Sequence, residues 1–140
     1  MTVGLWAGLL AVAAPMLAGQ PALAPIRTVD KGTQSEVSEP KNVVVRTEDE
    51  WTRLWHAHAP NREPPAVDFS REMVVGVFLG TKTTAGYDVQ IVKMLGNVVQ
   101  YRVSTPPRDA ITAQVLTMPY HLVAVPRRPG DVQFLLLLGG

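Results

Sequence analysis

The chain contains no cysteine among its 140 residues. This absence excludes a disulfide framework, thiolate zinc sites, cysteine nucleophiles and iron–sulfur ligation. The chain also lacks an excess of charge of one sign, because 13 Lys and Arg oppose 12 Asp and Glu for a net charge of +1. A nucleic-acid binder needs a concentrated basic face. We therefore expect no nucleic-acid partner.

No charged side chain occurs before Arg27, and residues 3–18 are almost all Ala, Leu, Val, Gly or Trp. This composition is typical of the apolar region of a signal peptide. Ala22 and Ala24 are small residues that fit the −3 and −1 positions of a cleavage site. We predict a signal peptide over 1–24 and an exported protein, which would be periplasmic, in the cell envelope or extracellular.

An uncleaved membrane anchor and a mis-assigned start codon are the alternatives for the same segment. A membrane-spanning helix needs about 20 apolar residues, and here Pro15, Pro21 and Pro25 interrupt the stretch. The mature form is therefore expected to contain no membrane span. Residues 25–41 contain few large apolar side chains, so we interpret them as a linker to a single domain over 42–140.

The clearest local signal is a helix that starts after Thr47. Thr47 and Glu50 have the spacing of a capping box, in which each side chain bonds the other residue's backbone N–H. One apolar stripe then follows at helical spacing, formed by Trp51, Leu54, Trp55 and His58. Pro60 ends the pattern. The sequence predicts one amphipathic helix here.

Short β-branched or alternating runs predict the strands. The segment 73–79 is apolar on both alternating faces, which indicates a central strand buried on both sides. Gly76 within it would let a large side chain, such as a helix tryptophan, approach closely. Further strands are expected at 43–45, 87–91, 99–103, 120–125 and 132–138, with a short one at 113–116. The predicted fold is α+β, with one amphipathic helix packed on a mainly antiparallel sheet of five or six strands.

Gly96-Asn97 marks a hairpin between the strands at 87–91 and 99–103. A two-residue loop would place Ile91 opposite Arg102, whereas a loop with one more residue places Ile91 opposite Tyr101 and matches the apolar faces. We therefore predict a three-residue or bulged turn.

Catalytic and metal-binding patterns are missing from the sequence. His56 and His58 point to different sides of the predicted helix and cannot chelate one ion together. No serine stands in a G-x-S-x-G elbow, and no glycine-rich nucleotide motif occurs. We expect no metal, no cofactor and no enzymatic activity. A carboxylate–histidine cluster in a cleft would instead favour an enzyme with an unrecognised site.

The loop over 80–87 is the one segment whose composition suggests binding. It joins two predicted strands and is rich in hydroxyl groups, and such loops on rigid strands often carry function. The predicted partner-binding residues are Lys82, Thr83, Thr84, Ala85, Gly86 and Tyr87. An equally weighted interpretation is a structural crossover in which Gly80 and Gly86 supply unusual backbone angles.

Four blocks of the sequence resemble one family in order. They are Glu50-Trp51 with Leu54-Trp55, the segment 67–80, Thr84-Ala85-Gly86-Tyr87, and Met118-Pro119-Tyr120-His121-Leu122-Val123. Over about residues 43–135 the chain resembles the C-terminal domain of the PrcB family of protease-complex subunits. The family's loop usually reads Gly-Gly-Tyr, where this chain has Ala85-Gly86-Tyr87.

The resemblance implies an exported bacterial protein that binds a partner protein without catalysis. It would help to assemble or stabilise a secreted protease complex. Thr83 to Tyr87 also resemble the Thr-Thr-Gly-Tyr loop of chagasin-like cysteine-protease inhibitors, whose all-β sandwich lacks the helix predicted here. The alternative function is therefore a protease inhibitor that inserts the 80–87 loop into a protease cleft.

Overall fold

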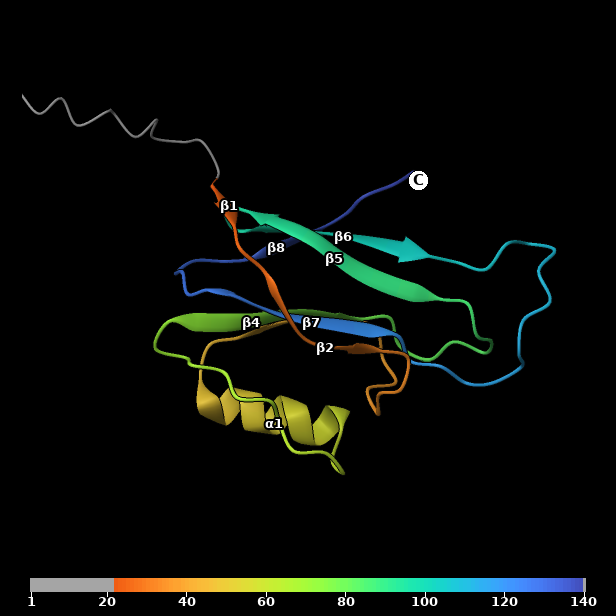
Figure 1. Ribbon diagram of the computed structural model, residues 1–140, viewed down its shortest axis with the longest axis horizontal. Helices are drawn as coiled ribbons and strands as arrows, with labels where there is room; N and C mark the ends of the chain where they lie inside the picture. The colour runs from red at the N-terminus through yellow and green to blue at the C-terminus, as the bar shows by residue number, and fades with distance from the viewer. Residues whose placement is uncertain (1–21, 140) are drawn as a thin grey trace, which may run out of the picture.

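The computed structural model describes residues 22–139, which form three layers (Figure 1). One four-stranded sheet has the strand order β1-β5-β6-β8, and a second has the order β2-β7-β4-β3. The bounds are β1 Leu23–Ala24, β2 Arg27–Gly32, β3 Lys41–Val45, α1 Glu48–His58, β4 Glu72–Phe78, β5 Asp88–Leu95, β6 Val98–Ser104, β7 Tyr120–Pro126 and β8 Gln133–Leu136. The α+β class is confirmed. The single sheet of five or six strands is wrong, because eight strands divide into two sheets that pack face to face.

Helix α1 covers the outer face of the second sheet, as Figure 1 shows. The predicted Thr47 cap is present: the Glu50 amide donates to the Thr47 hydroxyl at 3.1 Å. The reciprocal bond of the box differs, because the Glu50 carboxylate accepts from the Thr47 hydroxyl at 3.0 Å. The four residues of the predicted stripe are all buried. They pack on one face of the sheet, where they form a core with Val74, Phe78 and Leu122.

Strand β4 lies inside the second sheet and is buried on both faces, as predicted. Met73, Val75 and Val77 point to the first sheet, and Val74 and Phe78 point to the helix. The close neighbour at Gly76 is not a tryptophan. A Cβ atom there would lie 2.3 Å from Leu122 Cδ2 and 3.0 Å from Val43 Cγ2. The glycine therefore makes room for side chains of the two neighbouring strands.

The β5–β6 hairpin has the predicted register with a different loop. Val89 faces Val103 and Ile91 faces Tyr101, but Leu95 faces Val98, so the turn at Gly96-Asn97 has two residues. The additional residue is taken up by a bulge between Ile91 and Lys93 inside the strand. A bulge restores the apolar pairing just as a longer turn would, because either one adds a single unpaired residue.

The segment predicted to be a linker belongs to the folded domain. Strand β2 pairs antiparallel with β7, and Ser35 and Val37 beyond it are buried. An edge strand gains stability from backbone hydrogen bonds, so it needs few large apolar side chains to hold its place. Most of the predicted signal peptide, residues 1–21, lies outside the described residues. Leu23 and Ala24 pair with Leu95 and Met94 as β1.

The C-terminal half also differs from expectation in two strands. Residues 113–116 are irregular, and β8 is shorter than predicted and runs parallel to β6. Leu135, Leu136 and Leu138 remain exposed at the edge of the first sheet. No helix between residues 22 and 139 is long and apolar enough to cross a membrane.

Candidate functional site

Two irregular segments meet at one end of the sandwich. The 80–87 loop carries the chain from β4 in one sheet to β5 in the other, and residues 105–119 return it from β6 to β7. The amides and carbonyls of Lys82 and Thr117 bond each other at 2.7 and 2.9 Å. Ala85 donates to the Ala113 carbonyl at 3.0 Å, and the buried Thr117 hydroxyl donates to the Thr84 carbonyl at 3.0 Å. The two segments therefore form one cross-linked unit.

The predicted binding residues differ in how far they reach the surface. Thr83 and Gly86 are exposed, whereas Lys82, Thr84, Ala85 and Tyr87 are half-buried. The Lys82 ammonium lies 5.2 Å from the centroid of the Tyr87 ring, a cation–π contact that holds both side chains within the loop. Gly86 has φ +101°, and a Cβ atom there would lie 2.9 Å from Pro106. The loop thus has a defined shape set by its contacts with residues 106–117.

The returning segment brings three large apolar side chains to this end of the molecule. Ile111 is fully exposed, and Val115 and Leu116 are 50% and 63% exposed. Sequence reasoning missed Val115 and Leu116 because a strand at 113–116 would have buried half of its side chains, and Ile111 lay outside every predicted strand. The available signal was Pro106-Pro107 and Pro119, which bound a stretch that cannot easily pair in a sheet. We call Lys82 to Tyr87 with Ile111, Val115 and Leu116 the loop surface.

A carboxylate–histidine cluster lies on the helix side of the second sheet. The Nε2 atom of His58 lies 2.9 Å from Asp30 Oδ2, and its Nδ1 atom lies 2.7 Å from the Ser35 hydroxyl. Arg62 and the Tyr120 hydroxyl donate to the same Asp30 oxygen at 2.7 and 2.9 Å. A cavity of about 310 Å³ adjoins Ser35, His58 and Arg62. The partners are distant in sequence, which is why no motif revealed the cluster.

The electrostatics of the cluster follow from burial and hydrogen bonding. Burial lowers the pKa of His58, so its ring is neutral, with Nε2–H donating to Asp30 and Nδ1 accepting from Ser35. Burial acts to raise the pKa of Asp30, but hydrogen bonds from Arg62, His58 and Tyr120 outweigh it and lower the pKa. Burial and the Asp30 contact raise the pKa of Tyr120 to about 12. The carboxylate is therefore the charged centre of the cluster.

The order serine, histidine, carboxylate is that of a hydrolase relay. Here the Ser35 oxygen also accepts the Val37 amide at 3.0 Å, and the residue is 5% exposed. The carboxylate is shared among three donors from the helix, the following loop and β7. These contacts tie β2 to the helix and to the sheet, so the arrangement acts as a structural cross-link. Among residues 22–139, no group of three or more acidic or histidine side chains could hold a metal ion.

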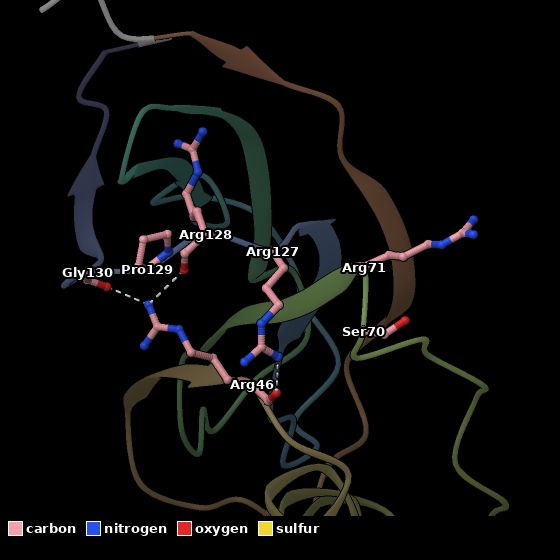
Figure 2. Close-up of a pocket in the computed structure, with 7 residues that line it drawn as sticks. All are labelled: Arg46, Ser70, Arg71, Arg127, Arg128, Pro129 and Gly130. Atoms are coloured by element: carbon pink, nitrogen blue, oxygen red, sulfur yellow. Dashed lines mark hydrogen bonds between the residues drawn. The ribbon is translucent and has the colours of Figure 1, made fainter.

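A basic pocket lies where β4 begins and β7 ends, and the loop surface adjoins the other ends of these two strands. Figure 2 shows the residues that line the pocket. It has a volume of about 620 Å³ and is lined by Arg46, Ser70, Arg71, Arg127, Arg128, Pro129 and Gly130. This pocket was not identified from the sequence. The antiparallel pairing of Glu72 with Pro126 brings Arg71 and Arg127 together, and the Arg127 amide donates to the Arg71 carbonyl at 2.8 Å.

Comparisons with known proteins agree with the resemblance noted in the sequence. Residues 73–126 match the family model described as PrcB C-terminal, a segment that runs from β4 through the loop surface to the end of β7. Neither the curated proteins nor the solved structures gave a match. The match supports the family prediction over this segment of the chain.

Proposed function

We propose that this chain is an exported, non-catalytic accessory protein that binds a partner protein and helps to assemble or stabilise a secreted protease complex. The family match supports a role connected with a protease complex. The apolar composition of residues 3–18 supports export. The observation that carries the binding proposal is the loop surface, where exposed apolar side chains stand beside a loop of fixed shape.

The physical case rests on exposed apolar area next to ordered polar groups. Single exposed apolar residues are common, but a cluster of them marks an interaction site. Ile111, Val115 and Leu116 come from one short segment that is bonded to the 80–87 loop at Lys82, Thr84 and Ala85. A partner covering this surface would bury these side chains and meet the exposed Thr83 hydroxyl at the rim.

The same contacts favour docking over insertion of the loop into a protease cleft. An inserting loop must project from its scaffold, whereas the Lys82 and Ala85 amides are already bonded to the returning segment. Inhibition of a papain-type protease by the purified protein at nanomolar concentration would support the inhibitor alternative.

The test is capture of partners from the cell envelope with the full chain carrying a C-terminal affinity tag. After chemical cross-linking, the proteins that co-purify would be identified by mass spectrometry. We expect a protease or a protease-complex subunit to recur with the unmodified chain and to be lost with Ile111→Ser combined with Leu116→Ser.

Leu138→Ser is the matched control, because Leu138 is 85% exposed and lies beyond β8, outside the loop surface. This variant should retain the partner. The absence of any recurring protein would contradict the proposal, as would equal loss of the partner in the control. Thermal unfolding of each variant would show that the fold is intact.

A further inference from the structure

We propose that the arginine pocket is a second binding site, which takes an acidic peptide segment of a partner protein. The pocket brings four of the chain's Lys and Arg residues to one place in a protein of net charge +1. It deepens the proposed function by adding a contact of different chemistry at the other end of the molecule.

The positive charge of the pocket is not neutralised from within. Among residues 22–139, no carboxylate lies within 4.0 Å of the guanidinium groups of Arg46, Arg127 or Arg128. Arg71 has one acidic neighbour, Asp68 at 3.8 Å, and both side chains are largely exposed, so this pair is weak. The pocket therefore keeps a net positive charge available to a ligand.

Neutral backbone groups hold the guanidiniums in place instead. Arg127 Nη1 donates to the Arg46 and Phe69 carbonyls at 2.9 and 2.8 Å. Arg46 Nη2 donates to the Gly130 carbonyl, and Arg128 Nη1 donates to the Gly96 carbonyl. A carbonyl orients an arginine without cancelling its charge, so these bonds prepare the groups to receive an anion.

The turn that carries Arg128 is itself fixed. The Asn97 side chain of the β5–β6 hairpin donates to the Pro129 and Asp131 carbonyls at 3.0 and 3.1 Å. Within the pocket, the buried Nε atom of Arg46 has no hydrogen-bond partner among the described residues. Unpaired buried donors are rare in folded proteins. Arg46 therefore has hydrogen-bonding capacity that the described residues do not use.

The arrangement favours a carboxylate-bearing segment over a single compact ion. Figure 2 shows Arg46 and Arg127 at the centre, with Arg128 and Arg71 reaching away on two sides. Charges spread in this way suit several carboxylates along an extended peptide, each met by a planar guanidinium fork. Acidic residues follow closely in sequence, with Glu48 to Glu50 after Arg46 and Asp131 after the turn. Because these carboxylates bound the positive surface, a short acidic segment can stay within it, whereas a long polyanion such as a nucleic acid or an anionic membrane surface would extend onto like charges.

The proposal is tested by fluorescence anisotropy of the full chain with a labelled hexaglutamate peptide, and with hexaglutamine for comparison. We expect saturable binding of hexaglutamate that weakens as salt is raised, with no binding of hexaglutamine. Arg71→Gln combined with Arg127→Gln should weaken hexaglutamate binding by about tenfold or more, because two charge-assisted contacts are lost. Arg127→Lys keeps the positive charge but loses the planar guanidinium group. Its affinity for hexaglutamate should lie between those of the unmodified chain and the double variant.

Arg102→Gln combined with Arg108→Gln is the control of equal charge change, because both arginines are exposed and lie outside the pocket. The proposal is overturned if this control weakens binding as much as the pocket variants do, or if folded pocket variants bind as well as the unmodified chain. Binding of anionic lipid vesicles that depends on the same arginines and exceeds hexaglutamate binding would also overturn it. Because the probe is a synthetic peptide, this test can fail while partner capture through the loop surface succeeds. Partner capture can likewise fail while hexaglutamate binding succeeds.

Discussion

The amide of Ile91 in β5 donates a hydrogen bond of 2.8 Å to Nδ1 of His121 in β7, which joins the two sheets through the core. Ile91 stands where the bulge of β5 begins. The other ring nitrogen of His121 lies 2.9 Å from the Thr28 hydroxyl. Since Nδ1 accepts, the proton resides on Nε2, and the buried ring must stay neutral to keep the bond.

Stability should therefore depend on pH through His121. Burial, aided by Lys31 and opposed by Asp88, lowers the pKa of His121 to about 4 from its ordinary 6.5. Because the unfolded state takes up a proton first, stability should fall as the pH falls from about 6.5 to about 4. The full shift corresponds to about 3 kcal/mol. His58, whose pKa is also lowered, should act in the same direction.

Urea unfolding at pH 7.5, 5.5 and 4.5 would measure this slope. His121→Asn keeps an acceptor near the Ile91 amide but cannot titrate, so we expect a flatter pH dependence in this variant. An unchanged slope would show that His121 is not the responsible group.

Gly76→Ala should destabilise the second sheet. The added methyl group would stand 2.3 Å from Leu122 Cδ2, inside a packed core between strands. We expect a loss of about 1–3 kcal/mol in the free energy of unfolding, as overpacked cores show. Gly32→Ala is the comparison, because its nearest neighbour is the end of the Tyr120 side chain at 3.2 Å. Equal effects of both changes on urea unfolding would contradict the packing argument.

Thr117→Val should loosen the loop surface. It removes the hydroxyl that donates to the Thr84 carbonyl and leaves that group without this partner, at a cost of about 1 kcal/mol. Hydrogen exchange at the Ala85 amide, which is bonded to the Ala113 carbonyl, should become faster. Thr117→Ser keeps the hydroxyl donor, so the Ala85 amide should exchange slowly in this variant. No difference between the two variants would mean that the hydroxyl does not hold the loop.

Ser35→Ala should behave as a structural change. It leaves His58 Nδ1 and the Val37 amide without their bonds to the hydroxyl, and we expect a loss of about 1–3 kcal/mol in unfolding free energy. A fluorophosphonate probe should leave Ser35 of the unmodified chain unlabelled. Labelling at Ser35 that disappears in His58→Gln would instead assign a hydrolase site to this cluster.

Local patterns predicted the elements whose causes lie within a few residues of chain. The Thr47–Glu50 cap and the stripe from Trp51 to His58 predicted the helix, and the doubly apolar run predicted β4. The family resemblance was likewise carried by short blocks. The residue register of the hairpin was also predictable, because pairing apolar faces permits few alternatives.

Features that depend on distant partners were not predictable. Strand β2 was mistaken for a linker because its stability comes from pairing with β7, which is distant in the sequence. The contact between Thr28 and His121, for example, joins residues 93 positions apart. The Asp30–His58 cluster and the arginine pocket arise from strand order, which leaves no local trace. The exposure of Ile111 and Leu116 had only the flanking prolines as a local signal.

The sequence by itself determined the absence of cysteine chemistry, the capped amphipathic helix, the core strand and the family resemblance of residues 73–126. Tertiary structure decided that the strands divide into two sheets, with apolar loop residues exposed at one end and arginines gathered at the other. The physical reason is the distance along the chain over which each kind of interaction acts. Side-chain periodicity and capping act over one or two turns of chain, whereas sheet order and convergent sites depend on which distant segments pair.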